Sequence, residues 1–256
     1  MLAGILAVAT LMGGANAAEA PDRNPQRFRV EFAVSNTVDL TAAGQGVMTS
    51  DINGTAVVTL TMSDTTGGRI AHLVVDSLTV SADGQAAMMF NQAAADALIG
   101  EWVHGYVVDG KIEGAPSQSQ EGNQILGLVG ATLSGLFPGV GAKTATAPSW
   151  SDTTSVQSES DGTSRNVQTV VDWSVTGRDG DAYVLSGAAN GTVTMDSPEQ
   201  QISGTVISNF SLTSTIGGPA SVSTTTSMQD LSLLVSALPD PLPVQVQQKF
   251  TVTEIK

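Results

Sequence analysis

The chain contains no cysteine and few basic residues. With Cys 0 in 256 residues, no disulfide can stabilise it and no thiol chemistry is available. It has 10 Lys+Arg against 24 Asp+Glu, which gives a formal net charge of -14. Nucleic-acid phosphates and anionic lipid surfaces both attract basic faces, so the charge argues against either as the principal partner.

Long apolar runs are also missing. The most apolar stretch is Met1–Gly14, which is shorter than the roughly 20 residues of a spanning helix. Ala15-Asn16-Ala17 follows as a small-x-small cleavage pattern, so we expect residues 1–17 to be a secretory signal peptide and 18–26 a linker. No Lys or Arg precedes the apolar core, which leaves an uncleaved N-terminal membrane anchor as the alternative. In both cases we expect a periplasmic or extracellular protein.

Residues suited to catalysis and metal binding are scarce. The two histidines are His72 and His104, and no Gly-x-Ser-x-Gly motif presents a nucleophilic serine for them. A histidine metal site needs further ligands, so two histidines without cysteine argue against zinc. The acidic residues are dispersed and single out no pair for glycoside chemistry. We therefore expect no enzyme activity, no metal and no cofactor, and a structural role for both histidines.

The chain has instead a repeated alternation of apolar and polar residues, interrupted by turn signals. Asn-Gly, Asp-Gly and Gly-Gly pairs accept the positive φ of tight hairpin turns. Tight turns join antiparallel neighbours, so the pattern predicts a β-meander. The pairs are Asn53-Gly54, Gly67-Gly68, Asp83-Gly84, Asp109-Gly110, Asp161-Gly162, Asp179-Gly180, Asn190-Gly191 and Gly217-Gly218. Asn190-Gly191 is also compatible with a bulge inside one long strand.

Strands are predicted on both sides of a central helical region. On the N-terminal side, Phe28, Val30, Phe32 and Val34 alternate with charged residues, as in a half-buried strand. The strands predicted before the second helix are 27–40, 55–63, 69–81, 101–108 and 111–113. Those predicted after it are 150–159, 164–177, 182–196, 201–215, 220–237 and 244–255.

Two stretches change to a helical period, at 85–99 and 121–137. The second carries Gly127, Gly130 and Gly135 and has no charged residue after Glu121 until Lys143. Glycine costs helix stability in water, about 1 kcal/mol each relative to alanine. This helix therefore needs a covering surface, which is usually the protein's own sheet and less often lipid or a partner.

The order of strands, two helices and more strands predicts an α+β domain that is mainly β. We expect residues 27–256 to form a single large curved antiparallel sheet, a half-barrel, packed against two helices. A Gly/Pro/Ala loop at 137–149 would separate its two lobes. The alternative is an all-β sandwich.

Four segments carry a resemblance to a known family. They are VVDSLTVSADG at 74–84, the helix–hairpin run 94–114, Leu136-Phe137-Pro138, and Ser149-Trp150-Ser151-Asp152. With the order of elements, they resemble the half-barrel carriers of the bacterial envelope, the LolA and LppX type. The resemblance covers most of the mature chain and implies a curved sheet around an apolar cavity lidded by helices. It also implies a carrier that works with donor and acceptor partners.

The predicted function is therefore a non-catalytic binding or carrier module for a lipid or other apolar ligand. The alternative is a structural or accessory subunit of a cell-envelope or surface assembly, so the expected partner is an apolar ligand or an envelope protein near the membrane. The candidate cavity residues are aliphatic, aromatic or methionine side chains of the two helical stretches, and they could equally just pack the helices on the sheet. They are Met88, Met89, Phe90, Leu98, Ile125, Leu128, Val129, Leu133, Leu136 and Phe137.

Overall fold

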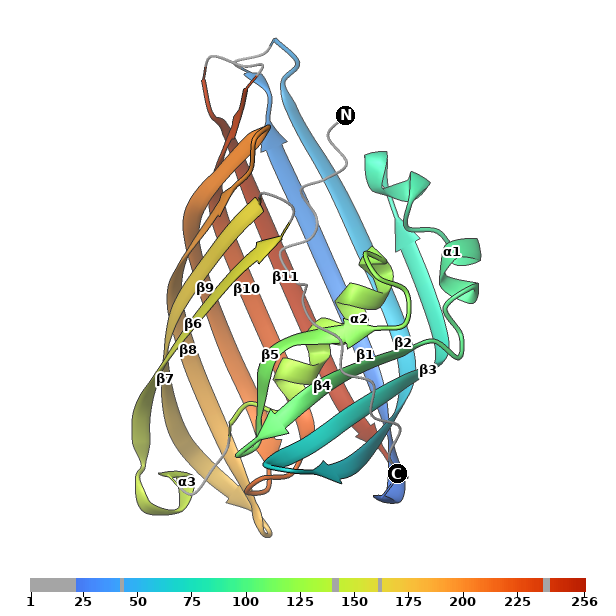
Figure 1. Cartoon of the computed structure of the whole chain (residues 1–256), viewed down its shortest axis with the longest axis vertical. Helices are drawn as coiled ribbons and strands as arrows, with labels where there is room; N and C mark the ends of the chain where they lie inside the picture. Colours follow the sequence, from blue (N-terminus) through green and yellow to red (C-terminus); the bar gives the residue numbers. More distant parts are fainter. Residues whose placement is uncertain (1–21, 42–43, 140–142, 161–162, 237–239) are drawn as a thin grey trace.

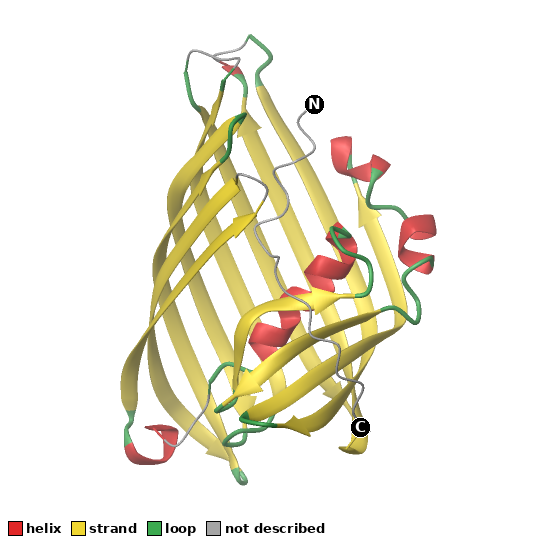
Figure 2. Cartoon of the chain, viewed as in Figure 1, coloured by secondary structure: helices red, strands yellow, loops and turns green. Residues whose placement is uncertain are grey.

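One antiparallel β-sheet organises the chain. A computed structural model describes residues 22–41, 44–139, 143–160, 163–236 and 240–256. Within these ranges eleven strands form a single open sheet in the order β5-β4-β3-β2-β1-β11-β10-β9-β8-β7-β6. Figures 1 and 2 show this sheet curving around helix α2. The prediction of a mainly-β chain with one antiparallel sheet is confirmed, and the described strands do not divide into the two sheets of a sandwich.

The strands are long, as the widely spaced turn signals predicted. Long neighbouring strands accumulate twist, which bends the sheet into the curved wall of Figure 2. Their bounds are β1 (Asp22–Asp39), β2 (Val47–Thr65), β3 (Gly68–Ala82), β4 (Trp102–Val108), β5 (Lys111–Gln118), β6 (Ser149–Ser160), β7 (Thr163–Asp179), β8 (Ala182–Asp196), β9 (Gln200–Ser214), β10 (Ala220–Val235) and β11 (Leu242–Ile255).

Among the described strands, only one pairing joins distant parts of the chain. β1 lies between β2 and β11, with Val30 opposite Ala56 on one side and Val252 on the other. Every other neighbouring pair is consecutive in sequence. The first and last strands therefore meet in the middle of the sheet, and its two edges, β5 and β6, come from the middle of the chain.

Alternation along the strands separates an inner face, toward α2, from an outer face. The residues predicted to lie inside on β1 do so: Phe28 and Val30 are 0% exposed, and Phe32 and Val34 are 3% exposed. The charged residues between them point outward and are exposed. One core cluster combines inner-face residues of strands before and after the 137–149 loop, so the loop does not divide the core.

The helices differ from the prediction in two places. The 85–99 stretch forms two short helices, the 3-10 helix η2 (Gly84–Met88) and α1 (Gln92–Asp96). Asn91 separates them because its backbone is extended and its side chain accepts a hydrogen bond from the Ala94 N–H, which starts a new helix. The 121–137 stretch forms α2 (Gln124–Leu136), capped in the same way by Asn123. A four-residue helix, α3 (Lys143–Thr146), lies within the predicted loop.

Most turn signals lie at turns. Asp109 and Gly110 have φ of 50° and 77°, as a type I′ hairpin between β4 and β5 requires. Gly67, Gly180 and Gly217 also have positive φ at their turns. Gly84 has positive φ too, but Asp83-Gly84 leads into η2 and not into a hairpin. Asp161-Gly162 lies outside the described residues.

Two predicted turns are wrong. Asn53-Gly54 lies inside β2, where a Cβ on Gly54 would come within 2.1 Å of the Phe32 ring. This glycine therefore makes room for a core aromatic. Asn190-Gly191 lies inside β8, where pairing with β7 and β9 continues without a register shift, so it is not a bulge either.

The predicted N-terminal boundaries fall mostly outside the description. The signal peptide at 1–17 and most of the linker at 18–26 precede Asp22, the first described residue. β1 begins at Asp22, so the described end of that linker segment is part of the sheet.

Candidate functional site: the inner face of the sheet

The ten predicted cavity residues separate into two groups. Met88 is 86% exposed and Met89 is 39% exposed, so neither lines an interior. The other eight belong to one core cluster and are between 0% and 7% exposed: Phe90, Leu98, Ile125, Leu128, Val129, Leu133, Leu136 and Phe137. The structure thus brings eight of them together, as packed core.

Helix α2 packs closely on the sheet because of its glycines. A Cβ on Gly130 would lie 3.1 Å from Val103 of β4, and one on Gly135 would lie 3.1 Å from the Ser223 hydroxyl of β10. From the sheet side, Gly105 leaves space beside Leu133. The main contacts of α2 are with β1, β4, β5, β10 and β11. Its covering surface is therefore the protein's own sheet.

The inner face beyond α2 has a different character. On β7–β10, Trp173, Tyr183, Leu185, Leu212 and Ala220 form a second, smaller cluster. Partly buried apolar side chains of β6, β7 and β9 pack against it; they are Trp150, Val171, Val175 and Phe210. We call these four residues the half-buried wall.

Aromatic contacts organise the half-buried wall. Trp173 lies opposite Trp150, with ring centroids 6.3 Å apart, and its centroid is 5.4 Å from that of Phe210. Gly187 faces the Trp173 ring, where any Cβ would lie 2.8 Å from it. Our sequence reasoning missed this cluster, although the alternation of Val171, Trp173 and Val175 places all three on one face.

The inner face also holds two buried amide side chains with polar atoms that have no hydrogen-bond partner among the described residues. Asn36 of β1 and Gln229 of β10 flank Val246 of β11 in register. They are 6% and 5% exposed, and both polar atoms of the Asn36 side chain and the Gln229 Oε1 lack a partner. Buried polar groups without partners are rare in native proteins.

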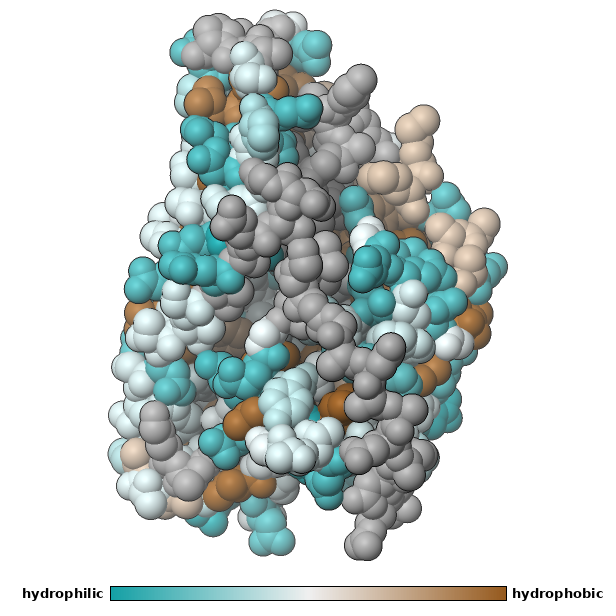
Figure 3. All heavy atoms as spheres, in the orientation of Figure 1, coloured by the Kyte–Doolittle hydropathy of each residue, from teal (hydrophilic) through white to brown (hydrophobic). Residues whose placement is uncertain are grey.

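The outer face is hollowed near its centre. A hollow of about 610 Å³ lies over β1, β2, β9, β10 and β11, and a neighbouring one of about 410 Å³ lies over β1, β2, β3 and β11. Both are lined by Asn53 and Lys249. These hollows open on the side of the sheet opposite α2. Figure 3 shows mainly hydrophilic residues along the visible side of β6 and β7.

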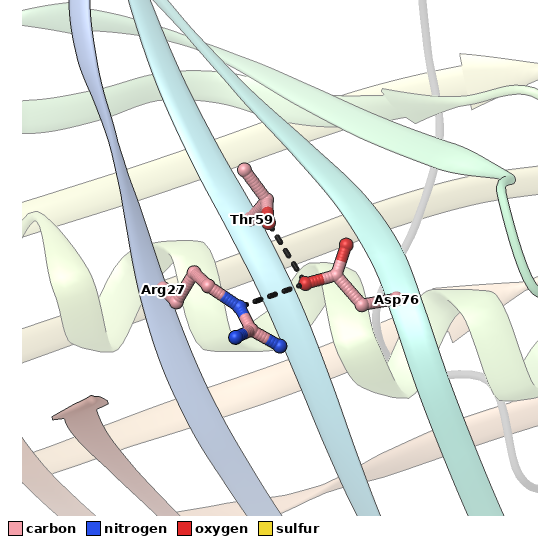
Figure 4. A network of polar contacts seen from close by, with 3 residues as sticks. All are labelled: Arg27, Thr59 and Asp76. Atoms are coloured by element: carbon pink, nitrogen blue, oxygen red, sulfur yellow. Dashed lines mark hydrogen bonds and ion pairs between the residues drawn. The ribbon is translucent and has the colours of Figure 1, made fainter. Parts of the chain in front are cut away.

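A three-residue polar network lies on the outer face of β1, β2 and β3 (Figure 4). Asp76 Oδ2 accepts hydrogen bonds from Arg27 Nε at 3.3 Å and from Thr59 Oγ1 at 2.8 Å. The Arg27 side chain is 57% exposed, so solvent screens the pair. The network ties adjacent strands together and shows no feature of a ligand site.

The two histidines, distant in sequence, are neighbours on the outer face. His72 of β3 lies opposite His104 of β4, and their Nδ1 atoms are 3.2 Å apart. The Trp102 ring stacks on His104 with centroids 4.0 Å apart. Burial lowers the pKa of His72 below its ordinary 6.5; burial and then the nearby His72 lower the pKa of His104.

Sequence reasoning missed this pairing. β3 and β4 are joined through η2 and α1 and not through a tight turn, so the spacing of the two histidines did not fix their register. The described residues contain no group of three or more His, Cys, Asp or Glu side chains placed to hold a metal ion.

On the inner face, burial lowers the pKa of the Arg165 guanidinium of β7.

None of the described helices has both the length and the apolar character needed to cross a membrane.

No protein-family model and no curated protein matches the chain. Two solved structures align with it: an outer membrane channel from Pseudomonas putida F1, and a mutant of the porin of Rh. blastica. The channel is 9% identical over 94% of this chain and 100% of that chain, with a TM-score of 0.18. The porin is 8% identical over 91% of this chain and 100% of that chain, with a TM-score of 0.20. Likeness at these TM-scores establishes no shared fold.

Proposed function

We propose that the protein is a non-catalytic binding or carrier module for a lipid or other apolar ligand, acting in the periplasm or outside the cell. In this proposal the sheet works as a half-barrel of the kind found in the LolA and LppX type of carrier. The observation that supports it is the contrast along the inner face. Side chains beneath α2 are fully buried, whereas the half-buried wall keeps apolar surface accessible.

A concave apolar surface is the usual form of a small-molecule site. The half-buried wall, and not the packed stripe of α2, is the surface that we assign to the ligand. Its aromatic rings supply a large contact area, and the aliphatic side chains of β7 extend that area along the strand. Both histidines lie on the opposite face, so the proposal gives them no part in ligand binding.

Two adjacent valines of β7 provide a matched test. Val171 belongs to the half-buried wall, and Val170 points outward and is 41% exposed. A carboxylate at position 171 would have to be desolvated or protonated beneath an apolar ligand, which costs several kcal/mol. At position 170 it would stay in water.

The experiment compares the wild type with Val171→Asp and Val170→Asp. Each chain is exported in a bacterial host, exposed to phosphatidylethanolamine/phosphatidylglycerol vesicles, and analysed by native mass spectrometry and organic extraction. We expect bound lipid on the wild type and on Val170→Asp, and at least a tenfold loss on Val171→Asp with an unchanged circular dichroism spectrum. A wild-type chain without bound lipid, or equal lipid on both variants, would reject the proposal.

The second candidate is a structural or accessory subunit that pairs through a sheet edge. One observation favours it: the edge strand β6 pairs with β7 in regular register over twelve residues and contains no proline or lysine to block a further strand. Hydrogen exchange on envelope fractions distinguishes the candidates. An accessory subunit would protect the β6 amides that face away from β7, whereas a carrier would leave them exchanging as in the isolated protein.

A further inference from the structure

The histidine pair on the outer face has a geometry that the proposed carrier function does not use. His72 and His104 project from directly opposite positions of β3 and β4, so the strand ladder fixes the separation of their backbones. Their ring centroids are 5.4 Å apart and their Nδ1 atoms face one another at 3.2 Å. The pair is half-buried, which leaves one side accessible to solvent.

Trp102 restrains the pair from one side. It stacks on His104 with an interplanar angle of 19°, and its centroid is 5.9 Å from that of His72. A ring held by stacking loses little freedom when it binds a ligand, because much of that freedom has already been lost in folding.

The nitrogen separation matches that of two ligands on one metal ion. Two imidazole nitrogens bound to a tetrahedral ion at 2.0–2.1 Å lie about 3.3 Å apart, and two cis nitrogens on a tetragonal ion lie about 2.9 Å apart. The observed separation of 3.2 Å is within a few tenths of an ångström of both values. At this distance an Nδ1–H of one ring can donate a hydrogen bond to the Nδ1 of the other. When both rings hold their proton on Nε2, a small rotation of the rings turns both Nδ1 lone pairs toward one cation.

We propose that His72 and His104 form an open, exchangeable binding site for a borderline divalent cation, with Cu²⁺ preferred and Zn²⁺ next. Imidazole nitrogen suits both ions, and Cu²⁺ is bound more tightly than Zn²⁺ by a given nitrogen site. Water completes the coordination, because the described residues offer no third His, Cys, Asp or Glu side chain to the pair. A closed four-ligand zinc site, which the sequence argues against, is a different arrangement from this one.

The composition makes the site easy to test. The chain contains His 2 and Cys 0, so any imidazole ligand must come from this pair. A tag-free full-length chain is treated with EDTA, dialysed, and titrated with CuCl₂ and with ZnCl₂ by calorimetry. Electron paramagnetic resonance of the copper-loaded wild type then counts the coordinated nitrogens without any variant.

We expect one Cu²⁺ per chain with two equivalent imidazole nitrogens in the spectrum, and weaker Zn²⁺ binding. His72→Gln and His104→Gln should each weaken Cu²⁺ binding by at least about tenfold. The loss of a residue that only hydrogen-bonds to a metal ligand already lowers metal affinity by about that factor, and the loss of the ligand itself should lower it at least as much. Tyr106→Phe, on the same outer face of β4, is the control and should leave binding unchanged. A wild-type spectrum with one imidazole nitrogen or none, or equal binding by the double His→Gln variant, would overturn the proposal.

Discussion

The Lys111 ammonium donates a hydrogen bond to Thr154 Oγ1 over 3.1 Å, joining the first residue of β5 to the middle of β6. These are the two edge strands of the open sheet, and they stand at opposite ends of the order of eleven strands. A second contact across the fold runs from the Arg69 guanidinium of β3 to the Gly217 carbonyl in the turn before β10. Both contacts draw the two sides of the curved sheet together at the end where α2 finishes.

Lys111→Met should loosen the β5–β6 approach without unfolding the domain. The bond is one side-chain contact, so the free energy of unfolding should fall by no more than about 1.5 kcal/mol. Hydrogen exchange of β6 amides near Thr154 should accelerate, and exchange in β1 should not change. Acceleration spread evenly over the whole sheet would contradict a local role.

Leu133→Ala tests whether the α2 stripe is core. Leu133 is 0% exposed in the main cluster, so truncation should cost about 2–5 kcal/mol in urea unfolding. Met88→Ala is the control and should cost less than about 0.5 kcal/mol, because Met88 is 86% exposed. A small loss for Leu133→Ala would instead place the stripe against a removable ligand.

Gly54→Ala should show why an Asn-Gly pair lies inside a strand. The new methyl group would meet the Phe32 ring, and we expect a loss of about 1–3 kcal/mol. Adding Phe32→Leu should recover part of that loss, which a double-mutant cycle measures as a coupling of about 0.5–3 kcal/mol. Gly177→Ala, whose Cβ would lie 3.9 Å from Val184, is the control and should be tolerated.

Asn36→Leu should raise the stability of the ligand-free protein. The Asn36 amide is buried without partners, and replacing such a group by an apolar one of similar shape removes a penalty of about 1–3 kcal/mol. Thermal melting of delipidated protein measures the effect. A lower melting temperature would mean that bound water or a ligand satisfies this amide.

Stability should fall in acid because of the histidine pair. The pKa values of His72 and His104 are lowered in the folded protein from the ordinary 6.5, mainly by burial, so below pH 6.5 the unfolded chain binds more protons than the folded one. The stability that the neutral pair contributes is complete above pH 6.5 and is lost as pH falls through the folded pKa values. In EDTA, the double His→Gln variant should lose less stability than the wild type between pH 7 and pH 5.

The sequence predicts where the strands begin and end better than it predicts which other strands and helices each one contacts. β8 matches its predicted bounds, 182–196, because clean alternation ends there at real turns. The Asn53-Gly54 pair predicts a turn but lies inside β2, because one sequence does not distinguish a tight turn from a glycine that makes room for a core ring. The structure brings eight of the ten cavity candidates together, yet burial decides whether an apolar stripe is core or ligand site. That depends on contacts with β1, β4, β5, β10 and β11, which no local pattern specifies.

The meeting of β1 and β11 in the middle of the sheet has a consequence for how the molecule is made. Two separate meanders, β1–β5 and β6–β11, can form locally, but they join only after the last fourteen-residue strand is available. Synthesis from the N-terminal side therefore leaves one side of β1 unpaired until β11 has been made, which exposes it to mispairing. A rearranged gene that began at β6 and joined β11 directly to β1 would encode the same sheet as one uninterrupted up-and-down run, in which every pairing is between consecutive strands.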